Sequence, residues 1–179
     1  MKFVSRENKE ETLLKLYNLY YNELFNYGYR VAQNEDITRD CIQDLFLQMF
    51  KRASFNDIRD PKPYLIKSLR FIIIDVLKKN KKLLLTPNEP NWLLSAEDIQ
   101  INNEIDEATG NRIKIALDTL THRQKEIIYL RFFSGFNYEE IAQITGINNQ
   151  SVRNLFSTAI KQLRKIMLPI LLMAIDIQA

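Results

Sequence analysis

The side chains best suited to reading a ligand are the amide, hydroxyl and basic groups that follow Asn148. Asparagine and glutamine can read adenine through paired hydrogen bonds, and arginine can read guanine in the same way. At helical spacing these side chains face outward together, while Val152 and Leu155 point to the other side. The residues expected to contact DNA are Asn149, Gln150, Ser151, Arg153, Asn154, Ser157 and Lys161. The pattern indicates a helix that enters the major groove.

Two short helices that cross steeply would position this surface, and the run YEEIAQITGINNQSVRNLFST, residues 138–158, has the required pattern. Ala142 permits a close approach, and Gly146 supplies the left-handed backbone of a tight turn. Asn137 and Asn148 precede the two helices as caps. An ordinary helical hairpin is the alternative, but spacing, glycine and caps all favour a helix-turn-helix.

Catalytic groups are scarce. The chain has one histidine, His122, expected on the surface, and one cysteine, Cys41, expected in the core. Neither a zinc site nor a nucleophile–base pair can be assembled from them, and no glycine-rich phosphate loop occurs. We therefore expect no metal, no cofactor and no catalysis by this chain.

The sequence predicts an all-α protein of two small helical domains joined by a flexible acidic linker. Residues 1–82 carry a net charge of +5, residues 83–111 carry −6, and residues 112–179 carry +4. Two basic modules around an acidic connector suggest two contacts with a polyanion. The expected helices are 9–32, 37–52, 61–79, 103–119, 122–133, 138–145 and 149–167, with little regular structure in 83–102.

The ends of the chain bear on localisation. The first dozen residues are too polar for a signal peptide, and the apolar tail is shorter than a membrane span and contains Pro169. A single cysteine suits a reducing compartment. We expect a cytoplasmic protein without direct membrane insertion.

Several motifs together resemble the extracytoplasmic-function (ECF) group of bacterial sigma factors, which keep only regions 2 and 4. The stretch LDTLTHRQKEIIYLRFFSGFNYEEIAQITGINNQSVRNLFSTAIKQLRKIM, residues 117–167, resembles region 4 throughout. The stretches DITRDCIQDLFLQMF, residues 36–50, and DPKPYLIKSLRFIIIDVLKK, residues 60–79, are similar to two helices of region 2. The domains are then region 2 (1–82), a linker (83–111) and region 4 (112–179).

The resemblance implies that the helix over 36–50 binds core RNA polymerase. The residues it assigns to this contact are Asp40, Gln43, Asp44, Leu45, Phe46 and Gln48. Carboxylates and amides beside apolar anchors suit a partner helix that carries arginine. A solvated face over a core stripe is the alternative explanation of these charges.

The resemblance also implies contact with promoter DNA at the −10 element. The residues assigned to it are Phe55, Arg59, Lys62, Lys67, Arg70 and Phe71. Aromatic faces can hold unpaired bases while cations hold the backbone. Tyr64 is expected to be buried and Phe55 to face a base. The family usually places asparagine where this chain has Phe71, which puts its usual −10 contact in doubt.

The helix from Asn149 should read the −35 element, with a surface richer in amides than is usual in the family. Implied partners are core RNA polymerase, promoter DNA and an anti-sigma factor. The main alternative function is a stand-alone helix-turn-helix regulator, which palindromic sites and a dimer in solution would favour. A pure protein-interaction module is disfavoured by the basic flank of the last helix, which comprises Arg153, Lys161, Arg164 and Lys165.

Overall fold

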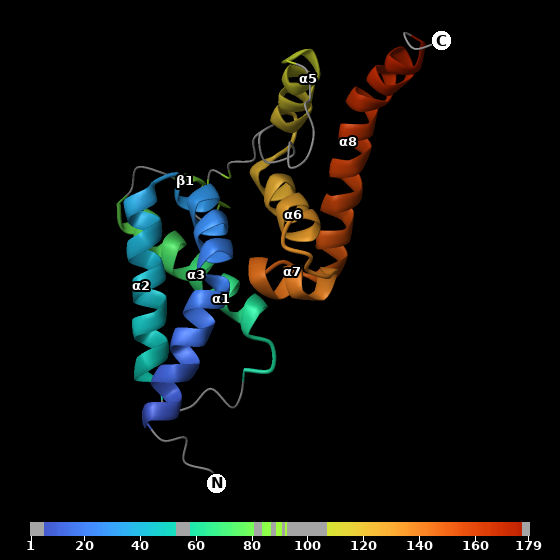
Figure 1. Ribbon diagram of the computed structural model, residues 1–179. Coiled ribbons are helices and arrows are strands. Elements are labelled where there is room, and N and C mark those ends of the chain that lie inside the picture. Colours follow the sequence, from blue (N-terminus) through green and yellow to red (C-terminus); the bar gives the residue numbers. More distant parts are fainter. Residues whose placement is uncertain are drawn as a thin grey trace. The chain divides into compact units, whose positions relative to one another are not determined.

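The computed structural model describes residues 6–52, 58–80, 84–86, 89–90, 92 and 107–176 (Figure 1). Side chains are described for residues 9–52, 58–80, 92 and 113–166. The chain divides into two compact helical units, and the first contains α1, α2 and α3 while the second contains α5, α6 and α8. The predicted all-α fold with a helix-turn-helix in its second half is confirmed.

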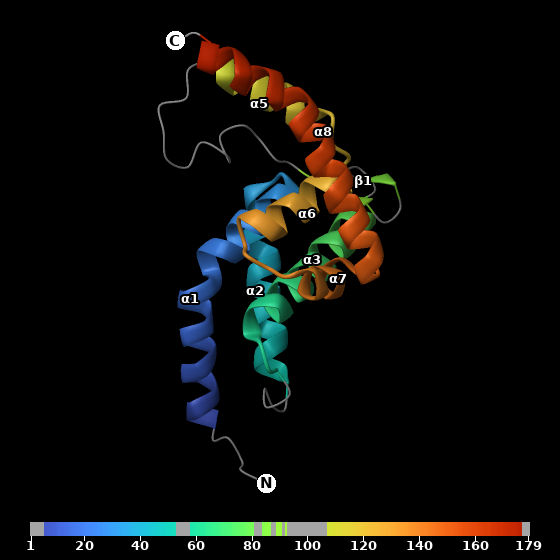
Figure 2. The ribbon, with the colours of Figure 1, turned by 90° about the vertical axis from the view of Figure 1, so that its right-hand side faces the viewer.

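The first unit is a bundle of three helices, α1 (Arg6–Ala32), α2 (Glu35–Lys51) and α3 (Pro61–Lys79), and each packs against the other two (Figures 1 and 2). Asn34 begins α2, because its side-chain oxygen accepts a 2.9 Å hydrogen bond from the backbone N–H of Ile37. Asp60 caps α3 in the same manner, and Pro61 occupies its first turn. The helix starts are therefore fixed by local chemistry.

Gly28 allows the three helices to approach closely at the centre of this bundle. A β-carbon built on it would lie 2.9 Å from Thr38 Cγ2 and 3.3 Å from Ile73 Cδ1. Thr38 is fully buried, and its hydroxyl donates to the backbone oxygen of Asn34 at 2.7 Å. The apolar residues of this core include Leu24, Tyr27, Ile42, Leu45, Met49, Leu65, Leu69, Ile73 and Leu77.

The acidic stretch between the units departs from the expectation of little regular structure. Strands β1 (Leu84–Thr86) and β2 (Glu89–Pro90) pair antiparallel. Trp92 is buried, and its backbone N–H donates to Nδ1 of His122 at 3.1 Å. His122 is therefore half-buried and hydrogen-bonded, and the expectation of a solvated surface residue was wrong. Residues 93–106 lie outside the described part of the chain.

The second half of the chain contains α5 (Glu107–Asp118), α6 (His122–Phe132), α7 (Tyr138–Thr145) and α8 (Asn149–Asp176), and α5 and α6 pack on α8 (Figure 1). Thr121 and Gln124 form the predicted capping box of α6. The predicted left-handed turn occurs at Gly146, with φ of 72°, and Gly135, which follows α6, also has a positive φ of 75°.

The last helix is longer than expected. We predicted an end at Met167, before Pro169, but α8 continues to Asp176. Proline removes one backbone hydrogen bond, yet the residues after it are leucine, methionine, alanine and isoleucine, which favour or tolerate a helix. Within the described residues, no helix is long and apolar enough to cross a membrane.

Candidate DNA-binding and polymerase-binding surfaces

The amino-terminal turns of α8 present the predicted recognition surface. Asn148 caps the helix, since its side-chain oxygen accepts a 2.8 Å hydrogen bond from the N–H of Ser151. Val152 and Ala159 are buried and anchor one side of the helix. Asn149 and Ser151 are half-buried, and the remaining predicted residues are exposed, namely Gln150, Arg153, Asn154, Ser157 and Lys161. The structure therefore brings the predicted set together on one helix.

Side-chain hydrogen bonds one turn apart organise this surface. Gln150 Nε2 donates to Asn154 Oδ1 at 3.0 Å, and Arg153 Nε donates to Asn149 Oδ1 at 3.0 Å. The second bond leaves both terminal nitrogens of Arg153 without a hydrogen bond in the part of the chain that the structure describes. A guanidinium held in this way can offer two donors to one guanine.

Tyr138, the first residue of α7, holds Arg153 in place and was missed by sequence reasoning. The Arg153 guanidinium lies 4.7 Å from the centre of the Tyr138 ring, and that of Arg131 lies 5.2 Å from it. Phe156 packs edge-on against the same ring, with the ring centres 5.5 Å apart. Arg131 also donates to the backbone oxygen of Phe136 at 3.0 Å. The only sequence signal was an aromatic residue at the start of a helix.

The predicted −10 residues on α3 differ from one another in exposure and in pairing. Lys67 and Phe71 are exposed, and the Phe71 side chain is 75% exposed although large aromatic residues are usually covered. Lys62 forms an ion pair with Glu23 of α1 at 2.9 Å, so part of its charge is neutralised within the unit. Arg70 is half-buried. Lys67 and Phe71, four residues apart on α3, are therefore the exposed members of this set on the helix.

Tyr64 and Phe55 are the two other aromatic residues considered for the −10 contact. Tyr64 is half-buried rather than fully buried, and its hydroxyl accepts a 2.5 Å hydrogen bond from Arg52 Nη1. The Arg52 guanidinium also lies 5.4 Å from the ring centre. Arg59 is exposed at the start of this region, whereas Phe55 lies outside the described residues.

On α2, Leu45 must be removed from the predicted polymerase-binding set. Its side chain is only 2% exposed because it points into the bundle core, so it cannot contact a partner at the surface. Phe46 is half-buried. The other four predicted residues are exposed, namely Asp40, Gln43, Asp44 and Gln48. These four residues form a polar flank on α2, and of the two predicted apolar residues only Phe46 is partly accessible.

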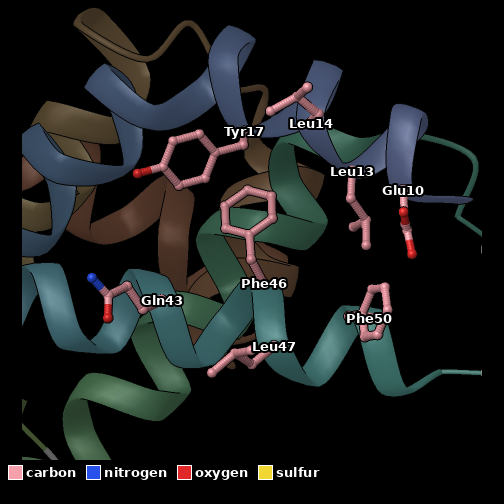
Figure 3. Close-up of a pocket in the computed structure, with 8 residues that line it drawn as sticks. All are labelled: Glu10, Leu13, Leu14, Tyr17, Gln43, Phe46, Leu47 and Phe50. Atoms are coloured by element: carbon pink, nitrogen blue, oxygen red, sulfur yellow. The ribbon is translucent and has the colours of Figure 1, made fainter.

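An open apolar groove of about 500 Å³ lies between α1 and α2. Figure 3 shows the side chains that line it, with Tyr17 beside Phe46. Leu14 of α1 is 61% exposed, and Leu47 and Phe50 of α2 are 56% and 38% exposed. The remaining lining residues are Glu10, Leu13 and Gln43. Sequence reasoning missed the contribution of α1 because its stripe looked like core.

Within the described residues, no cluster of three or more histidine, cysteine or acidic side chains could hold a metal. The Cys41 thiol is buried, and burial, together with the nearby Asp44 and Asp40, raises its pKa to about 11. A thiol with such a pKa is almost entirely protonated near neutral pH and is a poor nucleophile. Cys41 therefore acts as a small core residue, as expected.

Comparison with known proteins agrees with this arrangement. Residues 16–83 match the family described as sigma-70 region 2, and residues 116–165 match sigma-70, region 4. The chain is 33% identical over 147 residues to the RNA polymerase sigma factor SigV of Bacillus subtilis (strain 168), covering 79% of this chain and 82% of the relative. It is 23% identical to the ECF RNA polymerase sigma factor SigX of the same organism, covering 87% of this chain and 84% of the relative.

A solved structure has the same fold. The sigma factor RpoE from Bartonella quintana, in complex with the anti-sigma factor NepR, aligns with a TM-score of 0.58 at 24% identity, over 90% of this chain and 97% of that chain. With both family regions in order and a relative above 30% identity over most of its length, the chain belongs to the ECF group of sigma factors, which confer promoter specificity on bacterial RNA polymerase.

Proposed function

We propose that this sigma factor binds core RNA polymerase through the α1–α2 groove together with the polar flank of α2. The observation that carries this proposal is the open apolar groove, in which exposed Leu14 and Leu47 lie within reach of the exposed amide of Gln43. Apolar anchors surrounded by polar groups are the usual pattern of a protein-binding hot spot. Asp40 and Asp44 add negative charge, which suits a basic helix of the polymerase.

In this proposal, the first unit contacts the −10 element and the second unit contacts the −35 element. Phe71 and Lys67 of α3, with Arg59, contact the −10 element, where an uncovered aromatic ring can stack on an unpaired base. Phe55 is proposed to join them. The exposed face of α8, centred on Arg153, reads the −35 element.

An anti-sigma factor is proposed as the regulatory partner, by likeness to the solved relative, which is bound to a protein of that class. Such a partner can block the polymerase-binding groove or the recognition helix. A single free cysteine, Cys41, suits a protein that works in the reducing cytoplasm.

Substitution in the groove tests the polymerase-binding surface. Leu47→Glu places a charge in the apolar groove, and hot-spot losses of about 1–4 kcal/mol predict roughly 5- to 900-fold weaker binding of core polymerase. Asn26→Glu is the matched control, because Asn26 is exposed on α1 and does not line the groove. Affinity would be measured by competition with labelled wild-type protein. Wild-type affinity of a folded Leu47→Glu variant would remove the groove from the interface.

A further inference from the structure

The amino-terminal turns of α8 carry two side-chain pairs of the same construction. In each pair, the carbonyl oxygen of an asparagine accepts a 3.0 Å hydrogen bond from a longer side chain one helical turn away. Asn149 Oδ1 accepts from Nε of Arg153, and Asn154 Oδ1 accepts from Nε2 of Gln150. Both longer side chains are exposed. Each asparagine is therefore placed to restrain one longer, more flexible side chain.

The bonds leave different hydrogen-bonding groups available in the asparagines and in Gln150. A side-chain amide reads adenine with its carbonyl oxygen and one N–H together, so the oxygen must face the base. In Asn149 and Asn154 that oxygen is turned toward a neighbouring side chain. Gln150 donates through only one N–H of Nε2, and within the described residues its Oε1 has no hydrogen-bond partner. Gln150 can therefore present the complete adenine-reading pattern, whereas the asparagines cannot while they are bonded in this way.

Arg153 keeps its reading groups in a similar manner. Its bond to Asn149 uses Nε, so both terminal nitrogens remain for the O6 and N7 atoms of guanine. The Tyr138 ring, 4.7 Å from the guanidinium, restricts the same side chain from another direction. A side chain that is already oriented loses less conformational freedom when it binds. Arg153 is thus held through the one nitrogen that a bidentate contact with guanine does not need.

We infer that Asn149 and Asn154 are positioning residues, and that the bases are read by the side chains they hold, adenine by Gln150 and guanine by Arg153. The inference rests on the proposal that this face of α8 reads the −35 element. Residue type alone makes all three amides equivalent as readers of adenine, but their hydrogen bonds give them different roles. The alternative is that all four side chains read bases independently, with both bonds broken on DNA.

Replacement of Asn154 by alanine or by aspartate separates the two possibilities. Asn154→Ala removes the acceptor that holds Gln150. Asn154→Asp keeps an acceptor oxygen at that position, but an ionised carboxylate cannot donate to N7 of adenine. Aspartate should therefore restore the function of a positioning residue, and it should not restore the function of a residue that reads adenine itself.

The assay is transcription by reconstituted holoenzyme from templates with every single-base change in the −35 element, with the melting temperature as a check on folding. Gln150→Ala should lose roughly 5- to 150-fold of the preference for adenine at one position. Asn154→Ala should lose about fivefold at that same position, the equivalent of one hydrogen bond, and the double variant should lose no more than Gln150→Ala alone. Asn154→Asp should keep the preference, while its added negative charge lowers transcription from all templates alike.

Thr158→Asp is the control for the added charge, because Thr158 is exposed one turn beyond Asn154 and belongs to neither pair. It should lower transcription from all templates without a change of preference. A loss of preference with Asn154→Asp as large as with Asn154→Ala would overturn the inference, and so would a loss at a position that Gln150→Ala does not affect. A wild-type holoenzyme without preference at any −35 position would contradict the proposed function itself, which is a separate failure.

Asn149→Ala tests the second pair, first in the free protein by NMR. The Nε–H of Arg153 should exchange with water more slowly in the wild type than in Asn149→Ala, because the hydrogen bond protects it. In the transcription assay, Asn149→Ala should lose about fivefold of the preference for guanine at the position that Arg153→Ala affects. Equal exchange rates in the two proteins, or a loss at another position, would overturn the positioning role of Asn149.

Discussion

Arg153→Ala should change which −35 sequence the protein prefers. The Arg153 side chain is exposed on α8, held by Asn149 at 3.0 Å and by the Tyr138 ring at 4.7 Å. Both terminal guanidinium nitrogens are therefore presented as a pair. A bidentate contact with guanine contributes about 1–3 kcal/mol of discrimination, which is roughly 5- to 150-fold between the right and wrong base.

The fold itself should change little. Arg153 is exposed, and the contacts it loses within the unit are an exposed cation–π contact and one side-chain hydrogen bond, each contributing about 1 kcal/mol or less. The melting temperature should therefore fall by only a few degrees. A large loss of stability would mean that Arg153 holds the unit together and would invalidate it as a probe of recognition.

The assay is transcription by reconstituted holoenzyme from templates that carry every single-base change in the −35 element. Arg153→Ala should lose preference at one or two positions and keep the others. Arg164→Ala is the control, because Arg164 is an exposed cation further along the same helix and should weaken all templates alike through phosphate contacts. Uniform loss with Arg153→Ala would refute the proposed register of the helix.

Three further predictions follow from the described contacts. Tyr138→Leu should weaken the same base preference as Arg153→Ala, because Tyr138 acts by positioning Arg153. The double variant should therefore lose no more preference than Arg153→Ala alone. Additive losses in the same transcription assay would contradict this. Phe71→Ala should reduce strand opening by about 1–3 kcal/mol, measured by permanganate reactivity, with little loss of stability since the side chain is 75% exposed; unchanged opening would exclude stacking. Cys41 should resist Ellman's reagent at pH 8 until the protein unfolds. Because its folded pKa of about 11 lies above the ordinary value of 9.0, its contribution to stability should be lost as pH rises through that window; rapid modification of folded protein would contradict its burial.

Local chemistry explains which parts of the fold were predictable. The caps at Asn34, Asn148 and Thr121 and the glycine turn at Gly146 depend on neighbours within a few residues, and all four occur as predicted. Helical periodicity also predicted which side chains of α8 are exposed, because one face of the helix must be buried.

Contacts between distant segments could not be predicted from periodicity. Leu14 of α1 and Leu47 of α2 lie exposed along a groove between the two helices, and periodicity within either helix does not predict this groove. Leu45 is buried because its side chain lies in the core of the three-helix bundle. Nothing in the sequence indicated that Gly28 matters, although a β-carbon at this position would lie only 2.9 Å from Thr38 Cγ2. The contacts that bury Trp92 come from His122 and Tyr129, which lie 30 and 37 positions away.

Selection of active promoters from a randomised library tests the central claim most directly. Core RNA polymerase and this protein would transcribe templates with random −10 and −35 regions, and the transcripts would be sequenced. The account predicts initiation only with the sigma factor present, from templates that share two sequence elements at a restricted spacing. Initiation without enrichment of an upstream element, or no initiation at all from any template, would contradict it.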